Sequence, residues 1–124
     1  IRLSIAFSAD PVYVPVDVVQ FQQVLVNIVK NSVESIGTAM GGYVNIEVCG
    51  AMRPELVVTD NGAGISPEAA CNLFSPFYTT KPDGSGIGLT MTAEVLKKHN
   101  CRFSLITSDD DGLTRFTIKF PKHY

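Results

Sequence analysis

One long amphipathic segment limits what this chain can fold into. From Val18 to about Ile36, apolar side chains recur every three or four residues, which is the spacing of one face of an α-helix. Asp17 stands directly before the segment and can cap it, and the glycine-containing run at residues 37–42 ends it. The segment therefore predicts a long helix with one buried face.

The rest of the chain alternates between strand patterns, two further helical patterns and turn residues. The first strand pattern places Leu3, Ile5 and Phe7 on one face, which predicts a half-buried strand. A short helix is expected at residues 67–74 and a second amphipathic helix at 86–100. Strands or extended pieces are expected at 2–8, 11–17, 43–50, 55–60, 102–108 and 113–121. Together they predict an α+β fold, a two-layer sandwich with a mixed, mostly antiparallel sheet covered on one face by helices.

Length and composition favour one soluble globular domain, residues 1–124. The net charge of −2 does not favour contact with nucleic acid or with an acidic membrane, and no apolar run reaches membrane-spanning length. The three cysteines are widely spaced and odd in number, so we expect reduced, mostly buried thiols in a cytoplasmic protein. Because a strand pattern begins at the first residues, we expect a domain of a longer protein.

Two asparagines on the long helix are the first candidates for chemistry. Asn27 and Asn31 are four residues apart and share one face, with Lys30 beside them. Asparagine is disfavoured inside helices because its amide competes with the backbone, so the pair can line a cavity. An amide oxygen there can complete the coordination of a phosphate-bound Mg²⁺. The alternative is a solvated helix face.

A second candidate follows the strand at residues 55–60. Asp60 ends this strand, and a carboxylate at a strand end can accept a hydrogen bond from an exocyclic amine, which favours adenine over guanine. Gly62 and Gly64 would let the backbone pass beside a flat ring. The alternative is an ordinary Asp-Asn-Gly turn.

A third candidate is the stretch "PFYTTKPDGSGIGLT", residues 76–90. Its glycines precede a helix whose free N–H groups favour phosphate, and a lysine and two threonines can reach the same anion. The residues concerned are Thr79, Thr80, Lys81, Gly84, Gly86 and Gly88. The stretch lacks the Walker phosphate-loop pattern, and it does not follow a strand as a dinucleotide-binding motif does. The alternative is a flexible loop that enters a helix.

In order and spacing, five blocks closely resemble the catalytic ATP-binding domain of sensor histidine kinases, in the nitrogen-regulation and oxygen-sensing subgroup. The blocks are "NIVKNSVES", "DNGAGI", "LFSPFYTTK", "GSGIGL" and "TRFTIKFP". They are similar to the N, G1, F and G2 boxes and the closing strand of that domain, and they cover nearly the whole chain. The superfamily also includes gyrase, a heat-shock chaperone and mismatch-repair ATPases, so the resemblance implies the Bergerat fold.

The resemblance implies a role for each block in binding ATP and Mg²⁺. Asn31 would coordinate Mg²⁺, Asn27 would lie near the phosphates, and these two residues with Lys81 would serve catalysis. Asp60 would bind the adenine amine. The other residues implied to contact the nucleotide are Gly62, Gly64, Ile65, Phe77, Thr79, Thr80, Gly84, Ser85, Gly86, Gly88, Leu89 and Thr114.

The same resemblance implies a lid over ATP at about residues 75–85, anchored by Phe74 and Phe77. The sequence departs from the family pattern in two places. Residues 99–101 read His-Asn-Cys where the family has His-Gly-Gly, and Leu113 stands where a glycine precedes the last strand. Both departures affect local turns rather than the implied phosphate site.

The implied activity is phosphoryl transfer rather than hydrolysis. Hydrolytic members of the superfamily carry a glutamate at the position of Asn27, and an amide cannot act as a base. The resemblance implies a histidine acceptor on a separate dimerisation domain. His99 and His123 of this chain lack the expected setting, since they lie at a helix end and in the tail. Its partners would be ATP or ADP, that dimerisation domain and a downstream response regulator, and the isolated chain would have little autokinase activity. A related serine kinase and a non-catalytic nucleotide-binding module remain the alternatives.

Overall fold

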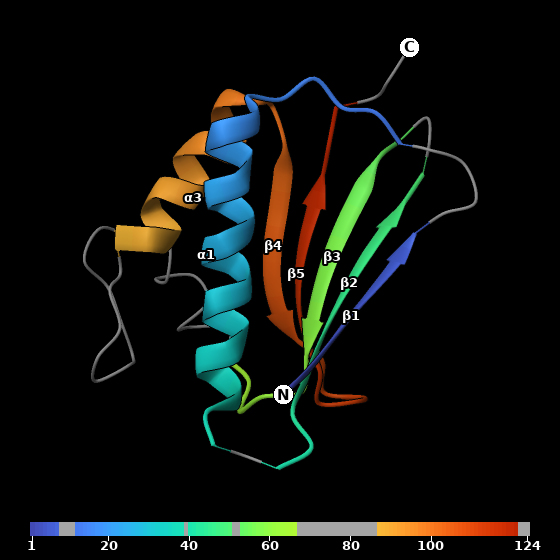
Figure 1. Cartoon of the computed structure of the whole chain (residues 1–124), viewed down its shortest axis with the longest axis vertical. Helices are drawn as coiled ribbons and strands as arrows, with labels where there is room; N and C mark the ends of the chain where they lie inside the picture. Colours follow the sequence, from blue (N-terminus) through green and yellow to red (C-terminus); the bar gives the residue numbers. More distant parts are fainter. Residues whose placement is uncertain (8–11, 39, 51–52, 67–86, 122–124) are drawn as a thin grey trace.

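The computed structural model describes residues 1–7, 12–38, 40–50, 53–66 and 87–121. The described residues form a five-stranded sheet in the order β1-β2-β3-β5-β4, with two helices on one of its faces (Figure 1). β1 runs parallel to β2, and every other neighbouring pair is antiparallel. The predicted α+β sandwich is therefore confirmed. The elements are β1 (Arg2–Phe7), α1 (Val18–Ile36), β2 (Tyr43–Cys49), β3 (Glu55–Asp60), α3 (Ile87–Lys98), β4 (Arg102–Thr107) and β5 (Thr114–Lys119).

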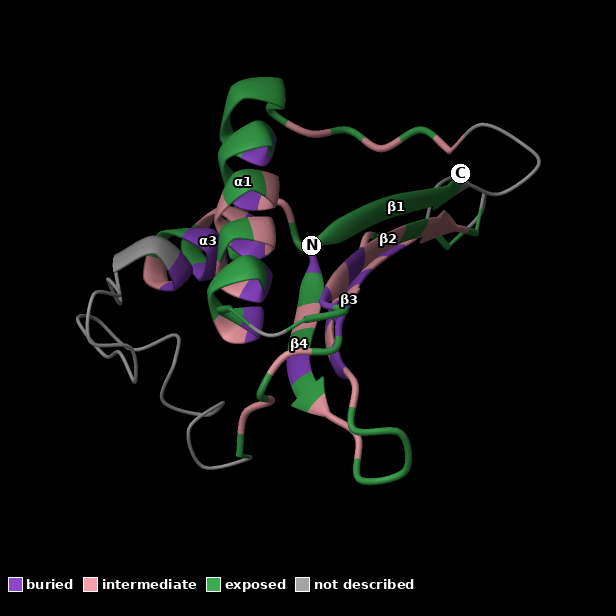
Figure 2. Cartoon of the chain, turned by 60° about the horizontal axis from the view of Figure 1, so that its bottom comes forward, coloured by how far each residue is buried: buried purple, intermediate pink, exposed green. Residues whose placement is uncertain are grey.

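The core lies between the helices and the inward face of the sheet (Figure 2). Helix α1 has the bounds that its periodicity predicts, and the Asp17 carboxylate caps it by accepting a hydrogen bond from Gln20 N at 2.9 Å. Its buried face packs against alternate side chains of the strands, since successive residues of a strand point to opposite faces. The buried residues of α1 are Phe21, Val24, Ile28, Ser32 and Ile36, and those of β3 and β5 are Leu56, Val58, Asp60, Thr114, Phe116 and Ile118.

The end of α3 is fastened to the start of α1 by His99. Its Nδ1 lies 2.8 Å from Val95 O, and its Nε2 accepts a hydrogen bond from Asp17 N at 3.0 Å. The prediction that His99 is a structural residue at a helix end is thus confirmed. Asn100 adopts the left-handed conformation with φ of 58°, which is how asparagine can replace the glycine usual after a helix.

The N-terminal part of the chain departs from prediction in two ways. Residues 12–17 form no strand, so the strand counted there before the long helix is absent over the described part of 11–17, although Asp17 has an extended backbone. Leu3 and Ile5 are 55% and 53% exposed, because β1 lies at the edge of the sheet beyond the cover of the helices (Figures 1 and 2). The alternation in β1 is real, but its apolar face is largely uncovered.

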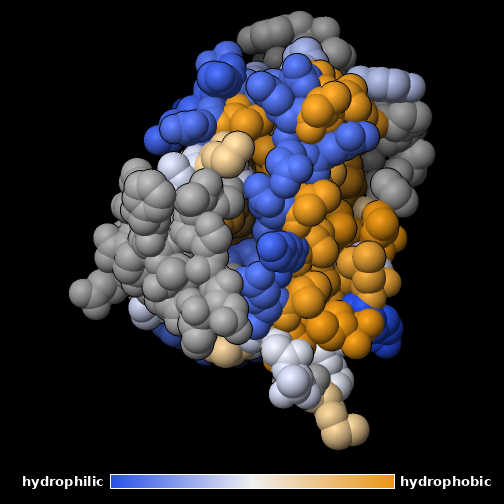
Figure 3. Space-filling view, turned by 60° about the vertical axis from the view of Figure 1, so that its left-hand side comes forward, coloured by the Kyte–Doolittle hydropathy of each residue, from blue (hydrophilic) through white to orange (hydrophobic). Residues whose placement is uncertain are grey.

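Helix α1 also exposes an apolar flank. Its exposed valines are Val18, Val19, Val26 and Val33. In the space-filling view an apolar band runs alongside a polar band on this side of the molecule (Figure 3). Across the described residues neither helix offers an apolar stretch fit to cross a bilayer.

The two cysteines of the described residues, Cys49 and Cys101, are free thiols. Cys101 is buried beneath α3 and Cys49 is half-buried at the end of β2. Burial raises the pKa of the Cys101 thiol above its ordinary value. Cys71 and the short helix expected at residues 67–74 lie outside the described residues.

Candidate functional site

Asp60 is the buried carboxylate around which the candidate site is built. It is the last residue of β3, it is 2% exposed, and it faces the helices between Val44 of β2 and Thr114 of β5. Its Oδ1 accepts a hydrogen bond from Gly62 N at 2.9 Å. A carboxylate is costly to bury without hydrogen-bonding partners, and this bond from the following loop supplies one.

The loop after Asp60, residues 61–66 and hereafter the base-side loop, packs against the last turn of α1. A methyl group on Gly62 would lie 2.5 Å from Ser35 Oγ and 2.8 Å from Ile36 N, so only glycine fits without movement. Ala63 N donates a hydrogen bond to Ser35 O at 3.1 Å. The loop is thereby placed one helical turn beyond Asn31.

The two asparagines of α1 occupy the half-buried border of that helix. Asn27 Oδ1 accepts a hydrogen bond from Gln23 Nε2 at 3.1 Å, and both asparagines are partly shielded from solvent. Because they stand four residues apart, they lie on one face, with Asn31 nearer to the Ser35 contact. Asn31 and Asp60 thus lie toward the same end of the α1–β3 interface, where the loop after β3 contacts the last turn of α1.

The far side of the base-side loop rests on β4. Gly64 has φ of 85°, and a methyl group on it would approach Thr107 Cγ2 to 3.0 Å. Ile65 N donates a hydrogen bond to Thr107 Oγ1 at 2.8 Å, and this hydroxyl lies 2.8 Å from Thr114 Oγ1. The loop is therefore held on both sides, by α1 and by β4.

Three residues of this arrangement were missed by the sequence reasoning. Ser35 and Thr107 hold the loop from outside; Ser35 ends the first of the five blocks but was given no role, and Thr107 stands in none of them. Asn61 Oδ1 accepts from Tyr43 N at 2.8 Å while its Nδ2 donates to Gly41 O at 3.0 Å, which fixes the loop to the start of β2. The Asp-Asn-Gly signal could have suggested Asn61, since asparagine side chains often bond nearby backbone in turns.

The glycine-rich entry to α3 is described only in part. The helix begins at Ile87 with Gly88 in its first turn. Leu89 is 6% exposed and belongs to the core, so its side chain is committed to packing and only its backbone is suited to meet a ligand. The remaining members of this block lie outside the described residues: Phe74, Phe77, Thr79, Thr80, Lys81, Gly84, Ser85 and Gly86.

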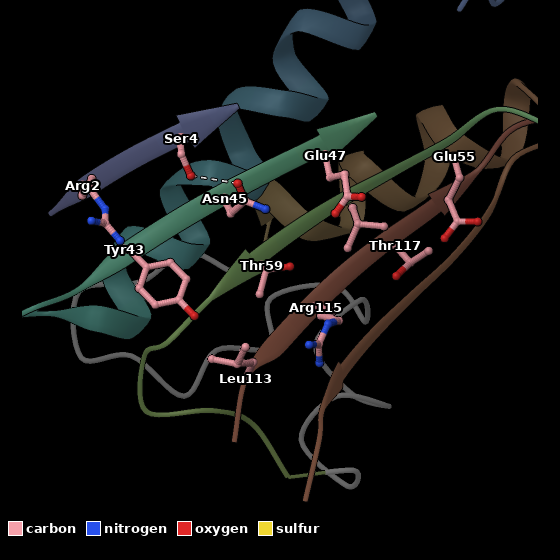
Figure 4. Close-up of a pocket in the computed structure, with 11 residues that line it drawn as sticks. Arg2, Ser4, Tyr43, Asn45, Glu47, Glu55, Thr59, Leu113, Arg115 and Thr117 are labelled. Atoms are coloured by element: carbon pink, nitrogen blue, oxygen red, sulfur yellow. Dashed lines mark hydrogen bonds between the residues drawn. The ribbon is translucent and has the colours of Figure 1, made fainter. Parts of the chain in front are cut away.

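The opposite face of the sheet carries a polar pocket that is separate from this site. Its volume is about 500 Å³, and it is lined from four strands by residues that include Arg2, Tyr43, Glu47 and Arg115 (Figure 4). Arg115 there pairs with Asp111 at 2.7 Å and holds the pKa of that carboxyl below its ordinary value. Because residues alternate along β3, Thr59 faces this pocket whereas Asp60 faces the helices.

Comparison with known proteins places this chain and its fold in a family. The sequence profile of the histidine kinase-, DNA gyrase B- and HSP90-like ATPases matches residues 16–124, so the chain belongs to this family. Within it, the chain is a catalytic domain of the sensor histidine kinase type. The resemblance inferred from the five sequence blocks is thereby confirmed.

Two curated relatives and one solved structure illustrate the likeness. Sporulation kinase A of Bacillus subtilis is 33% identical over 94% of this chain and 19% of its own length. The sensor protein FixL of Bradyrhizobium diazoefficiens is 33% identical over 94% of this chain and 24% of its own length. The catalytic domain of histidine kinase ThkA matches with a TM-score of 0.84 and 25% identity, covering 98% of this chain and 78% of that one. The chain thus spans less than a quarter of the length of either curated relative.

Proposed function

We propose that this chain binds ATP with Mg²⁺ at Asp60, the base-side loop and Asn31, and presents the γ-phosphoryl group to a histidine on a separate dimerisation domain. The observation that carries the proposal is the buried carboxylate of Asp60, held by Gly62 N beside a loop that packs on α1 without side-chain bulk. A buried carboxylate accepts a hydrogen bond from an exocyclic amine, and adenine has that donor where guanine has a carbonyl.

The described residues suit a metal that is held mainly by the substrate. They contain no group of three or more histidine, cysteine or acidic side chains that could hold an ion by themselves. Mg²⁺ commonly keeps several waters and takes one or two protein ligands together with phosphate oxygens. Bound Mg²⁺ would neutralise charge on the phosphates, and Asn31 is the residue we propose as its protein ligand, with Asn27 one turn earlier.

For the phosphate end of the proposed site, the residues are assigned from the sequence blocks. We propose that Lys81, Thr79, Thr80, Phe77, Gly84, Ser85, Gly86 and Gly88 meet the triphosphate from the lid and the start of α3. Lys81 would supply positive charge and the glycine-flanked helix start would supply N–H donors. Leu89, Ile65 and Thr114 complete the proposed contacts beside the base.

The wider setting follows from the relatives and belongs to the same proposal. We propose that residues 1–124 act as one cytoplasmic domain of a longer protein of a two-component system, with its own dimerisation domain and a response regulator as partners. One related solved structure is a complex of histidine kinase ThkA with the response regulator protein TrrA. Support for a kinase rather than a hydrolase comes from Asn27, whose amide cannot serve as a base.

Calorimetric titration with ATP, with and without Mg²⁺, tests the proposal. Asp60→Asn is expected to weaken ATP binding by about 10- to 100-fold, the usual worth of a hydrogen bond to a charged group. Asn31→Ala is expected to remove mainly the Mg²⁺-dependent part. Glu47→Gln and Asn45→Ala are matched controls, because both residues line the pocket on the opposite face of the sheet. A parent protein that binds no adenine nucleotide would overturn the proposal.

A second experiment separates the histidine kinase from a serine kinase of the same superfamily. The chain is incubated with labelled ATP and the dimerisation domain of its parent protein, and the phosphorylated product is treated with acid. An acid-labile product is expected, because phosphohistidine hydrolyses in acid whereas phosphoserine does not. An acid-stable product would favour the serine kinase.

A further inference from the structure

Three side chains form one row across the inward face of the sheet at the end of the site. Thr107 of β4 stands directly opposite Thr114 of β5, and Thr114 stands directly opposite Asp60 of β3. Thr107 shares the inward face with Leu105, which is buried in the core. The row therefore links the carboxylate expected to read adenine with a threonine that no sequence motif contains.

Hydrogen bonds connect this row of side chains to the base-side loop. Thr107 Oγ1 accepts a hydrogen bond from Ile65 N at 2.8 Å and lies 2.8 Å from Thr114 Oγ1. A hydroxyl carries one proton and two lone pairs. With one lone pair of Thr107 taken by the Ile65 N–H, its proton and its second lone pair are both open to Thr114. In the arrangement we propose Thr107 is the donor, so the Thr114 proton points onward.

The side chain of Thr107 also supports the loop by contact. Gly64, with φ of 85°, passes so close that an added methyl would lie 3.0 Å from Thr107 Cγ2 and 3.2 Å from its Oγ1. Two consecutive residues of the base-side loop, Gly64 and Ile65, therefore rest on one threonine. That threonine ends a strand of the sheet, which is a rigid support.

We infer that Thr107 is a positioning residue for adenine recognition, and this inference rests on the proposed function. It holds the base-side loop against β4 through Ile65 N and orients the Thr114 hydroxyl toward the base. Thr107 does not touch the nucleotide in this account. Loss of Thr107 is therefore expected to weaken binding of the base and to leave binding of the phosphates unchanged.

Thr107→Val keeps the shape of the side chain and removes its hydroxyl. Ile65 N then loses its acceptor and Thr114 loses its partner, so ATP affinity is expected to fall about tenfold. Affinity for inorganic tripolyphosphate, which has no base, is expected to stay at the parent value. Thr107→Ser retains the hydroxyl and is expected to restore ATP binding. Thr117→Val is the matched control, because Thr117 faces the opposite side of the sheet.

Binding is measured by calorimetry at a temperature where circular dichroism shows each variant folded. Hydrogen exchange of the Ile65 amide, followed by NMR without nucleotide, is expected to speed up in Thr107→Val and to keep the parent rate in Thr107→Ser. If Thr107→Val does not fold, Thr107→Ala against Thr107→Ser makes the same comparison.

The outcomes distinguish this inference from the proposed function. Unchanged ATP affinity in Thr107→Val, or an equal loss for ATP and tripolyphosphate, would overturn the role of Thr107 while ATP binding by the parent stands. A tenfold loss in Thr107→Ser together with parent affinity in Thr107→Val would show that the methyl group matters and not the hydroxyl, which would overturn the inference. A parent that binds no ATP would refute the proposed function and this inference together.

Discussion

Replacing Gly62 by alanine probes the contact between the base-side loop and α1. The added methyl would lie 2.5 Å from Ser35 Oγ, 2.7 Å from the carbonyl carbon of Ser35 and 2.8 Å from Ile36 N. Two of these atoms belong to the backbone of the last helical turn, so no side-chain rotation relieves the overlap. The loop has to move away from the helix, which stretches the hydrogen bond from Ala63 N to Ser35 O.

The expected loss of stability follows from these two effects. Overpacking of this kind costs about 1–3 kcal/mol, and a weakened backbone hydrogen bond adds about 1 kcal/mol. We therefore expect the free energy of unfolding to fall by about 3 kcal/mol in Gly62→Ala. With a urea dependence of about 2 kcal/mol per molar, the unfolding midpoint should drop by about 1.5 M. ATP affinity should fall as well, because the displaced loop carries the donor to Asp60.

Gly112→Ala is the control for this experiment. Gly112 has φ of 70° and no atom within 4 Å of an added methyl, so alanine there suffers only conformational strain of about 1 kcal/mol. ATP affinity should be unchanged in this variant. A urea midpoint for Gly62→Ala equal to that of the parent, or a larger loss in Gly112→Ala, would refute the close contact between loop and helix.

Three further predictions concern residues away from the loop. His99→Ala removes the acceptor for Asp17 N and a hydrogen bond to Val95 O, so the free energy of unfolding in urea should fall by about 1–2 kcal/mol. A change in ATP affinity in this variant would contradict a purely structural role for His99. Burial raises the pKa of Cys101 above its ordinary value of 9.0, so the unfolded chain ionises there before the folded one. The contribution of Cys101 to the free energy of unfolding, measured in urea, should therefore be fully present below pH 9.0 and should be lost as the pH rises from there through the raised pKa. Cys101→Ala should make this loss of stability with pH shallower. An unchanged slope in Cys101→Ala would contradict the prediction. Iodoacetamide at neutral pH should label the half-buried Cys49 before Cys101, as peptide mass spectrometry would show.

The sequence was enough for the elements that local patterns determine. Apolar spacing predicts α1 from Val18 to Ile36, and the structure has the same bounds. The strands at 43–50 and 55–60 and the closing hairpin also appear, one or two residues shorter at some ends. Periodicity works here because each element buries one face, and burial fixes both the period and the element.

Features that depend on packing between distant segments could not be predicted from the sequence. Alternation in β1 shows which side chains share a face, but it does not show that the helices stop short of covering Leu3 and Ile5. An extended piece was expected at residues 11–17, yet residues 12–17 pair with no other strand among the described residues. Thr107 has a role only because β4 ends opposite Thr114, and a single sequence contains no signal for such a register.

The candidate site divides in the same way. Asp60, Gly62 and Gly64 were singled out from a short motif, and the structure brings them together with Asn31 at one end of α1. Their roles in binding ATP remain predictions. The lid residues and Lys81 were inferred from sequence blocks alone, and they lie outside the described residues.

The exposed first strand has a consequence for how the molecule opens. Within the described residues β1 pairs with β2 alone, and Leu3 and Ile5 are more than half exposed, so little apolar burial is lost when it detaches. Asp60, Thr107 and Thr114 all lie on strands beyond β2. We therefore expect a partly unfolded form without β1 to keep these residues in place and, under the proposed function, to bind a nucleotide as well as the native form does. A ligand that does not distinguish two states cannot shift their balance, so saturation with ATP should leave hydrogen exchange in β1 unchanged while slowing it around Asp60.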